Sequence, residues 1–170
     1  NLFAMVSDLE KKYSSCEFVC RIKEIVPSIE DRILFYDTCK DSYFDNNSSN
    51  LEATLKDIMD NHKELLLKMK TYIDETSMLH KVGLIKTWKD DNDYRMKPSR
   101  DGYEIFLGEF AECKMNKIKD LDKFEFVKSV DDYVQMRRRE NYSYRKVVCE
   151  IRRLEHENSN LEIVKKAWEL

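Results

Sequence analysis

Glycine and proline are scarce in this chain, whose 170 residues include only 3 Gly and 2 Pro. Tight turns, bulges and phosphate-binding loops depend on these residues, so their scarcity excludes a glycine-rich nucleotide-binding loop. No apolar run approaches the roughly 20 residues that a membrane-spanning helix needs. The chain is therefore expected to consist of long helices with few connections.

The 5 cysteines are odd in number and show no repeating spacing, so we expect no disulfide framework. This pattern is typical of a reducing compartment and predicts a cytoplasmic protein, either soluble or peripheral on membranes. Cys16 and Cys20 lie one helical turn apart, but His62, His80 and His156 show no metal-ligand spacing. We therefore expect no metal, no cofactor and no enzymatic activity.

Charged residues make up 37% of the chain and apolar residues 42%, with a net charge of −3. Such a mixture suits amphipathic helices whose outer faces are solvated. The 9 Tyr, 8 Phe and 2 Trp exclude an intrinsically disordered chain, which would have far fewer aromatic residues. The composition thus favours a folded, helical protein.

The middle of the chain has a heptad spacing, because apolar residues recur at alternating steps of four and three from Leu51 to Leu79. Neither Gly nor Pro interrupts it, and Ser49 with Glu52 has the spacing of a capping box, so one helix is predicted over 50–86. Its apolar stripe must be buried against another helix, which predicts an oligomer seam. The residues predicted to line this seam are Leu51, Leu55, Ile58, Leu65, Met69, Tyr72 and Leu79.

The first segment is predicted to be a helix over residues 1–44 that is kinked at Pro27. A proline inside a helix removes one hydrogen bond and crowds the carbonyl group four residues back, so a kink or break is expected near Val26. Ser28 with Asp31 has the spacing that caps a new helix start.

The second half of the chain contains a polar segment over 87–101, which is predicted to be a loop or hairpin tip. Helical spacing resumes over 103–116 and again over 122–170, where apolar residues fall on two heptad positions. Asn158 and Lys165 fall on the same seam, where a polar residue can fix register or partner number. The residues predicted to continue the oligomer seam are Val147, Ile151, Leu154, Leu161 and Trp168.

Together these segments predict a single all-α domain over 1–170, with three or four long helices forming an elongated coiled-coil-like bundle that is completed by oligomerisation. A bundle of this kind acts as a helical scaffold or adaptor, by dimerisation and protein-protein interaction in a homo- or hetero-oligomer. The same pattern allows a helical host-interaction or virulence domain.

A basic cluster lies between residues 137 and 153, where seven basic side chains stand against only Glu140 and Glu150. It is either a solvated flank that pairs with neighbouring carboxylates or a surface that binds acidic membrane. The acidic balance of the whole chain disfavours nucleic acid as a partner. The candidate residues for binding an anionic surface are Arg137, Arg138, Arg139, Arg145, Lys146, Arg152 and Arg153.

The stretch from Lys123 to Lys146 resembles a segment of sorting nexins of the BAR class, in which an apolar, Tyr-rich helix runs into a basic cluster and a charged coiled coil. Three long helices, a kinked first helix and Trp168 near the end of the last helix are also similar to that family. The resemblance implies a dimer of three-helix coiled coils that presses its basic cluster on curved acidic membrane during endosomal membrane trafficking. The polar segment 87–101 departs from the family, which has a continuous helical hairpin there.

Overall fold

A computed structural model describes residues 1–45, 47–108 and 122–157. The chain divides into two compact units, Asn1–Gln135 and Met136–Leu170. Helix α8 (Asp122–Glu157) belongs to both: its first turns are part of the first unit, and the remainder is the described part of the second. The other elements of the first unit are α1 (Leu2–Lys12), α2 (Glu17–Ile25), α3 (Ile29–Phe44), β1 (Ser49–Asn50), α4 (Leu51–Ile58), α5 (His62–Ile73), α6 (Met78–Lys81), β2 (Ile85–Asp90), β3 (Asp93–Pro98) and α7 (Arg100–Leu107).

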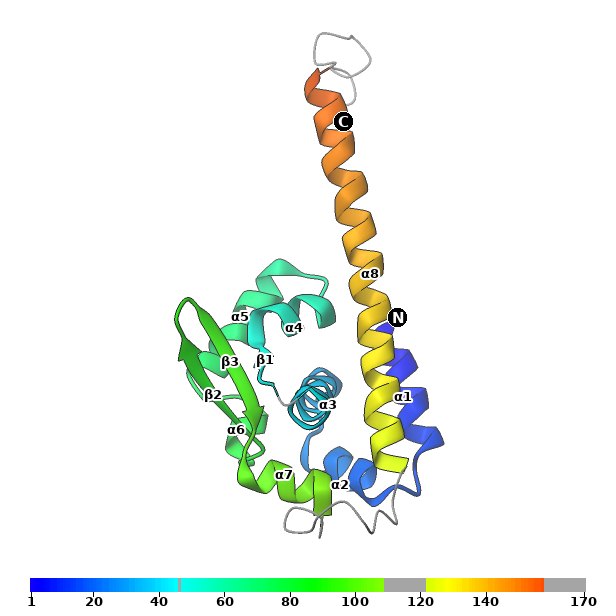
Figure 1. Cartoon of the computed structure of the whole chain (residues 1–170), viewed down its shortest axis with the longest axis vertical. Coiled ribbons are helices and arrows are strands. Elements are labelled where there is room, and N and C mark those ends of the chain that lie inside the picture. The colour runs from blue at the N-terminus through cyan, green and yellow to red at the C-terminus, as the bar shows by residue number, and fades with distance from the viewer. Residues whose placement is uncertain (46, 109–121, 158–170) are drawn as a thin grey trace. The chain divides into compact units, whose positions relative to one another are not determined.

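Helix α3 lies at the centre of the first unit, with α4 and the strands on one side and α1 and the start of α8 on the other (Figure 1). Its four consecutive apolar residues 33–36 span a full helical turn and are fully buried, because a turn that is apolar on every side must be enclosed. The ring of Phe126 on α8 packs edge-on against two tyrosine rings, with centroid distances of 4.8 Å to Tyr36 and 5.6 Å to Tyr13. These aromatic contacts join distant parts of the sequence into one core.

The first 44 residues form three helices instead of one kinked helix. Pro27 lies between α2 and α3, and Ser28 caps α3 by accepting a hydrogen bond from the backbone N–H of Asp31 at 3.2 Å, so the predicted break is confirmed. A further break at residues 13–16, which was not predicted, separates α1 from α2. It lets the apolar faces of both helices reach the same core.

The single helix predicted over 50–86 is wrong: three short helices and a strand occupy this segment. The side chain of Asn61 caps the start of α5 by accepting a hydrogen bond from the backbone N–H of Lys63 at 2.9 Å. The side chain of Ser77 caps the start of α6 by accepting one from the backbone N–H of His80. The predicted seam is therefore part of the first unit's own core and not a contact between chains. Leu51, Leu55, Ile58, Leu65, Tyr72 and Leu79 are buried there, and Met69 is partly buried.

The polar segment 87–101, predicted to be a loop or hairpin tip, holds the tip of a β-hairpin at 91–92 and most of its two strands, so the prediction missed the strands. Strands β2 and β3 pair antiparallel along their whole length, and β1 pairs with the other side of β3, which gives the order β1-β3-β2. Asp91 has φ 52°, a left-handed conformation that Asp tolerates and that helps the chain reverse direction. Ser49 is a strand residue, and Asn50 instead caps α4. The fold is mostly helical with a small sheet, and not an elongated bundle of three or four helices.

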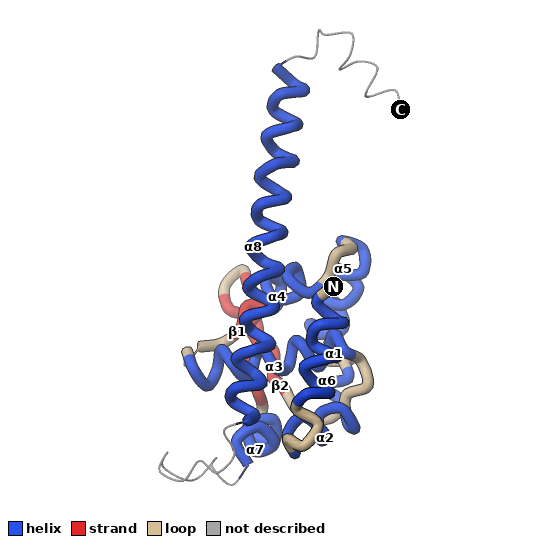
Figure 2. The backbone as a smooth tube through the Cα atoms, turned by 90° about the vertical axis from the view of Figure 1, so that its right-hand side faces the viewer, coloured by secondary structure: helices blue, strands red, loops and turns tan. Residues whose placement is uncertain are grey.

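Helix α7 begins earlier than the predicted helix over 103–116, and residues 109–121 lie outside the described residues. Gly102 in its first turn lies so close to the backbone that an added Cβ atom would be 2.1 Å from the carbonyl oxygen of Leu84. Helix α8 begins at residue 122 as predicted and is continuous to Glu157 (Figure 2).

Candidate functional site

Helix α8 has a sequence that favours a long helix, with neither Gly nor Pro and many Arg, Lys and Glu residues. Its apolar residues fall on the a and d positions of a heptad labelled a to g, at alternating steps of three and four, and this pattern is interrupted once, by Arg137 and Glu140. Position a is taken by Val130, Tyr144 and Ile151, and position d by Phe126, Tyr133, Val147 and Leu154.

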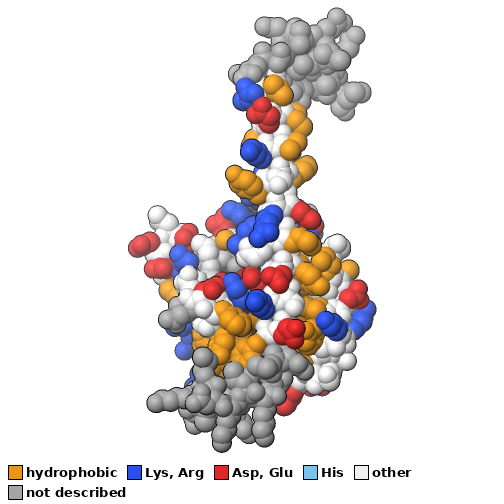
Figure 3. Space-filling view, turned by 45° about the vertical axis from the view of Figure 1, so that its right-hand side comes forward, with side chains coloured by type: hydrophobic (Ala, Val, Ile, Leu, Met, Phe, Trp, Pro, Cys, Tyr) orange, Lys and Arg blue, Asp and Glu red, His pale blue; other side chains and the backbone are white. Residues whose placement is uncertain are grey.

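The same repeat is buried in the first unit and exposed in the second. Phe126 and Val130 are fully buried. By contrast, the exposed fractions are 71% for Tyr144, 56% for Val147, 48% for Ile151 and 45% for Leu154. We call these last four residues the α8 seam; Figure 3 shows hydrophobic side chains at the surface along this part of α8. Of the predicted seam residues, Leu161 and Trp168 lie outside the described residues.

Basic side chains recur along α8 with the same seven-residue period as the seam. They come as pairs at positions b and c of three successive heptads. With about 100° between successive residues of a helix, positions b and c lie on the side opposite to a and d. Arg137 falls at position a and is only half-exposed, so it belongs to the other side of the helix. The exposed pairs, which we call the basic stripe, are Arg138, Arg139, Arg145, Lys146, Arg152 and Arg153.

Glu150 lies between the α8 seam and the basic stripe. Arg153 donates to it twice, from Nη2 to Oε1 at 2.6 Å and from Nε to Oε2 at 3.1 Å. The hydrogen bond from Arg153 holds the pKa of Glu150 below its ordinary value, although desolvation opposes the shift. Glu150 is thus a carboxylate, and its negative charge stands beside the seam.

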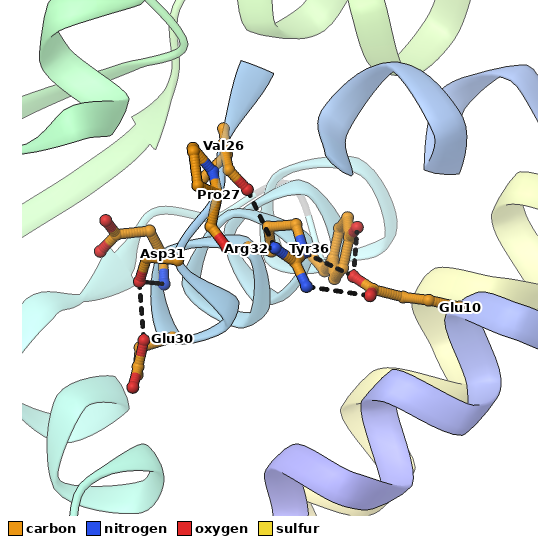
Figure 4. Close-up of polar contacts among 8 residues, drawn as sticks. Glu10, Val26, Pro27, Glu30, Asp31, Arg32 and Tyr36 are labelled. Atoms are coloured by element: carbon orange, nitrogen blue, oxygen red, sulfur yellow. Dashed lines mark hydrogen bonds and ion pairs between the residues drawn. The ribbon is translucent and has the colours of Figure 1, made fainter. Parts of the chain in front are cut away.

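A buried ion pair joins α1 to α3 in the first unit (Figure 4). The guanidinium of Arg32 donates to both carboxylate oxygens of Glu10, at 2.7 and 3.0 Å, and also to the backbone carbonyls of Val26 and Pro27. The hydroxyl of Tyr36 donates to the same carboxylate at 3.0 Å. This charged cluster is enclosed and fully hydrogen-bonded by its own chain, so it serves the fold.

Burial and charge in this cluster fix its protonation states. Burial alone would lower the pKa of Arg32, but the hydrogen bond to Glu10 and its negative charge outweigh burial and raise that pKa. Burial, and then the charge of Glu10, raises the pKa of Tyr36 well above its ordinary value. Tyr36 therefore stays protonated and keeps its role as a hydrogen-bond donor.

A second polar cluster joins α5 to α3. The hydroxyl of Tyr72 donates to Oδ1 of Asp31 at 2.7 Å, and Nζ of Lys68 lies 2.6 Å from the same oxygen. Burial, and then the charge of Asp31, raises the pKa of Tyr72, so its hydroxyl also remains a donor. Sequence patterns did not indicate either cluster, because their members lie far apart along the chain.

The arrangement closest to a catalytic one is a serine–histidine pair. Ser77 Oγ is 2.7 Å from Nδ1 of His80, and Nε2 of His80 is 2.9 Å from the hydroxyl of Thr87. In nucleophilic enzymes a carboxylate orients the imidazole, whereas here a threonine does so and the serine is the buried cap of α6. The pair joins α6 to β2. Among the described residues, no group of three or more His, Cys, Asp or Glu side chains is arranged to hold a metal ion.

Comparisons with known proteins found no match: no family model, no curated protein and no solved structure is significantly similar to this chain. Within residues 1–45, 47–108 and 122–157, none of the helices has both the length and the apolar character that crossing a membrane requires. The surface features of α8 are therefore the basis for a functional proposal.

Proposed function

We propose that this chain is a non-enzymatic helical adaptor that works by protein-protein association, with the α8 seam as its docking surface. The observation that supports the proposal is the exposure of four large apolar side chains at a/d spacing on one helix. A stripe of this kind is the half of a coiled coil that a second helix completes.

The energetics of burial favour such an association. Burying a fully exposed Val, Leu or Ile side chain contributes about 1.5–3 kcal/mol, and the α8 seam offers three of these side chains, each about half exposed, and a tyrosine. Pairing with a second helix would also stabilise α8 itself, since most helical stability in proteins comes from packing of an apolar face. The part of α8 in the first unit already has such packing, because its apolar residues lie in the core.

Binding of a designed helix tests this proposal. The neutral probe is a helical peptide with Ile at a, Leu at d, and Gln at e and g. We expect the whole chain to bind this probe in fluorescence anisotropy or to self-associate in sedimentation equilibrium, because either event buries the seam.

A chain with Ile151→Lys and Leu154→Lys should lose both kinds of association. The matched control is Leu66→Lys with Leu67→Lys, which alters two exposed leucines of α5 and should leave association intact. A wild-type chain that stays monomeric and binds no helix, or a seam variant that binds as well as the wild type, would contradict the proposal.

Binding of acidic membrane is the second candidate function, and the basic stripe favours it. Six exposed basic residues repeat over three heptads on the side of α8 opposite to the seam, so a lipid surface and a partner helix would not compete. Each basic residue near an acidic membrane contributes about 1 kcal/mol. The resemblance to BAR-class sorting nexins points to the same ligand.

Vesicle co-sedimentation tests this second function. A variant with Arg139, Arg145, Lys146 and Arg152 changed to Gln should bind vesicles containing phosphatidylserine much more weakly than the wild type. The control changes four exposed lysines of the first unit, Lys63, Lys81, Lys86 and Lys89, to Gln and alters the net charge equally. If both variants lose binding to the same extent, net charge and not the stripe attracts the membrane.

A further inference from the structure

We infer that the α8 seam binds a helix of another protein that carries Lys or Arg beside its apolar stripe, in preference to a second copy of this chain. The inference rests on the proposed adaptor function and adds the chemistry that selects the partner. Positions e and g carry that chemistry, because their side chains flank the a/d stripe and meet the partner across it.

The flanks of the α8 seam are acidic in its C-terminal part, whereas Ser143 and Val148 take the g and e positions beside Tyr144 and Val147. Glu150 takes position g, and along the same helix Glu155 and Glu157 take positions e and g. From residue 150 to residue 157, every e and g position is therefore a glutamate.

Pairing of two copies would place these glutamates against one another. In a parallel pair, position g of one helix faces position e of the next heptad of the other, so Glu150 of each copy faces Glu155 of the other copy. In an antiparallel pair, e faces e and g faces g, which brings carboxylates together where the segments 150–157 of the two helices overlap. Like charges at these positions disfavour both arrangements.

The chain's own basic residues do not relieve this repulsion. The basic stripe occupies positions b and c, which point away from the seam when two helices pair. Arg153 contacts Glu150 from that outer side and leaves it 56% exposed. A carboxylate has further acceptor sites, so a lysine from a partner helix can still bind Glu150.

The seam also indicates the arrangement of the complex. Ile151 at position a with Leu154 at position d is the combination that favours two parallel strands. The partner is thus a single parallel helix with basic flanks.

Three probe helices test the inference on the whole chain. They share the Ile and Leu core of the neutral probe and differ only at e and g, which are Lys, Gln or Glu. The Lys probe should bind at least tenfold more tightly than the Gln probe, and the Glu probe at least tenfold more weakly. At 1 M salt these differences should shrink, because screening then acts over roughly 3 Å.

A charge-reversed chain provides the second measurement. With Glu150, Glu155 and Glu157 changed to Lys, the order of the three probes should invert while the apolar seam is unchanged. Equal binding of the three probes, or self-association of the wild type tighter than its binding of the Lys probe, would overturn the partner selection and leave the adaptor function standing. If the chain binds no probe and does not self-associate, the adaptor function itself fails.

Discussion

The two parts of helix α8 have one heptad repeat but different surroundings. Up to Gln135 its apolar residues pack into a core built by α1 and α3, with Phe126 against Tyr36. From Met136 onward the same spacing carries exposed side chains, among them Val147 and Ile151. A heptad repeat therefore indicates only that an apolar stripe of the helix must be buried. What buries it, the chain's own fold or another protein, depends on tertiary structure.

Substitution of two valines of α8 tests this comparison most directly, because both valines have the same side chain and lie on the same helix. Val130→Asp places a carboxylate in the core with no compensating partner and should destabilise the first unit by about 4 kcal/mol or more. Val147→Asp changes an exposed position and should alter that stability by no more than about 0.5 kcal/mol.

Urea denaturation followed by circular dichroism measures both variants. Equal destabilisation by the two substitutions would show that the second part of α8 is packed as tightly as the first. It would also remove the reason for assigning a docking role to the seam.

The two ion pairs extend the comparison from apolar to charged side chains. Glu10→Ala leaves Arg32 buried without its carboxylate and should cost about 3–5 kcal/mol of stability. A double variant, Glu10→Leu with Arg32→Met, should recover most of this loss because no buried charge remains. Glu150→Ala removes a solvent-exposed pair with Arg153 and should leave the denaturation midpoint unchanged. A Glu10→Ala chain as stable as the wild type would show that the cluster is not enclosed in solution.

The smallest expected effect is a pH dependence confined to the first unit. Burial lowers the pKa of His80, so the unfolded chain binds a proton more readily than the folded one. The stability that neutral His80 contributes should therefore be fully present above about pH 6.5, and the free energy of unfolding should decrease as the pH falls below that value. His80→Gln should flatten this slope between pH 7 and about pH 5, whereas His62→Gln, at an exposed position of α5, should retain it. The same slope in both variants would remove His80 as its source.

The sequence predicted the features that depend on local chemistry. The break at Pro27 and the Ser28 cap each follow from one or two neighbouring residues, and the start of α8 follows from the heptad spacing of its apolar residues. The helix over 50–86 could not be excluded in this way, because the steps of three and four continue across the caps at Asn61 and Ser77. These caps were the available signal that the segment consists of several short helices.

Other features have no local signal at all. The hairpin formed by β2 and β3 lacks the glycine that usually marks such a turn, and Asp91 adopts the left-handed conformation instead. Glu10 and Arg32 are 22 positions apart, so only the fold brings them together. In α8 the basic residues were predicted as one cluster, and placing them on the helix separates Arg137 from the basic stripe.

Hydrogen exchange along α8 tests the central claim most directly. Amides of residues 123–134 should be protected in the chain alone, whereas those of 144–154 should exchange quickly, because an isolated stretch of helix is marginally stable in water. Addition of the Lys probe at saturating concentration should slow exchange in 144–154 and leave 123–134 unchanged. If 144–154 is as protected as 123–134 in a monomeric chain, or gains no protection when the probe is added, the α8 seam is not a docking surface.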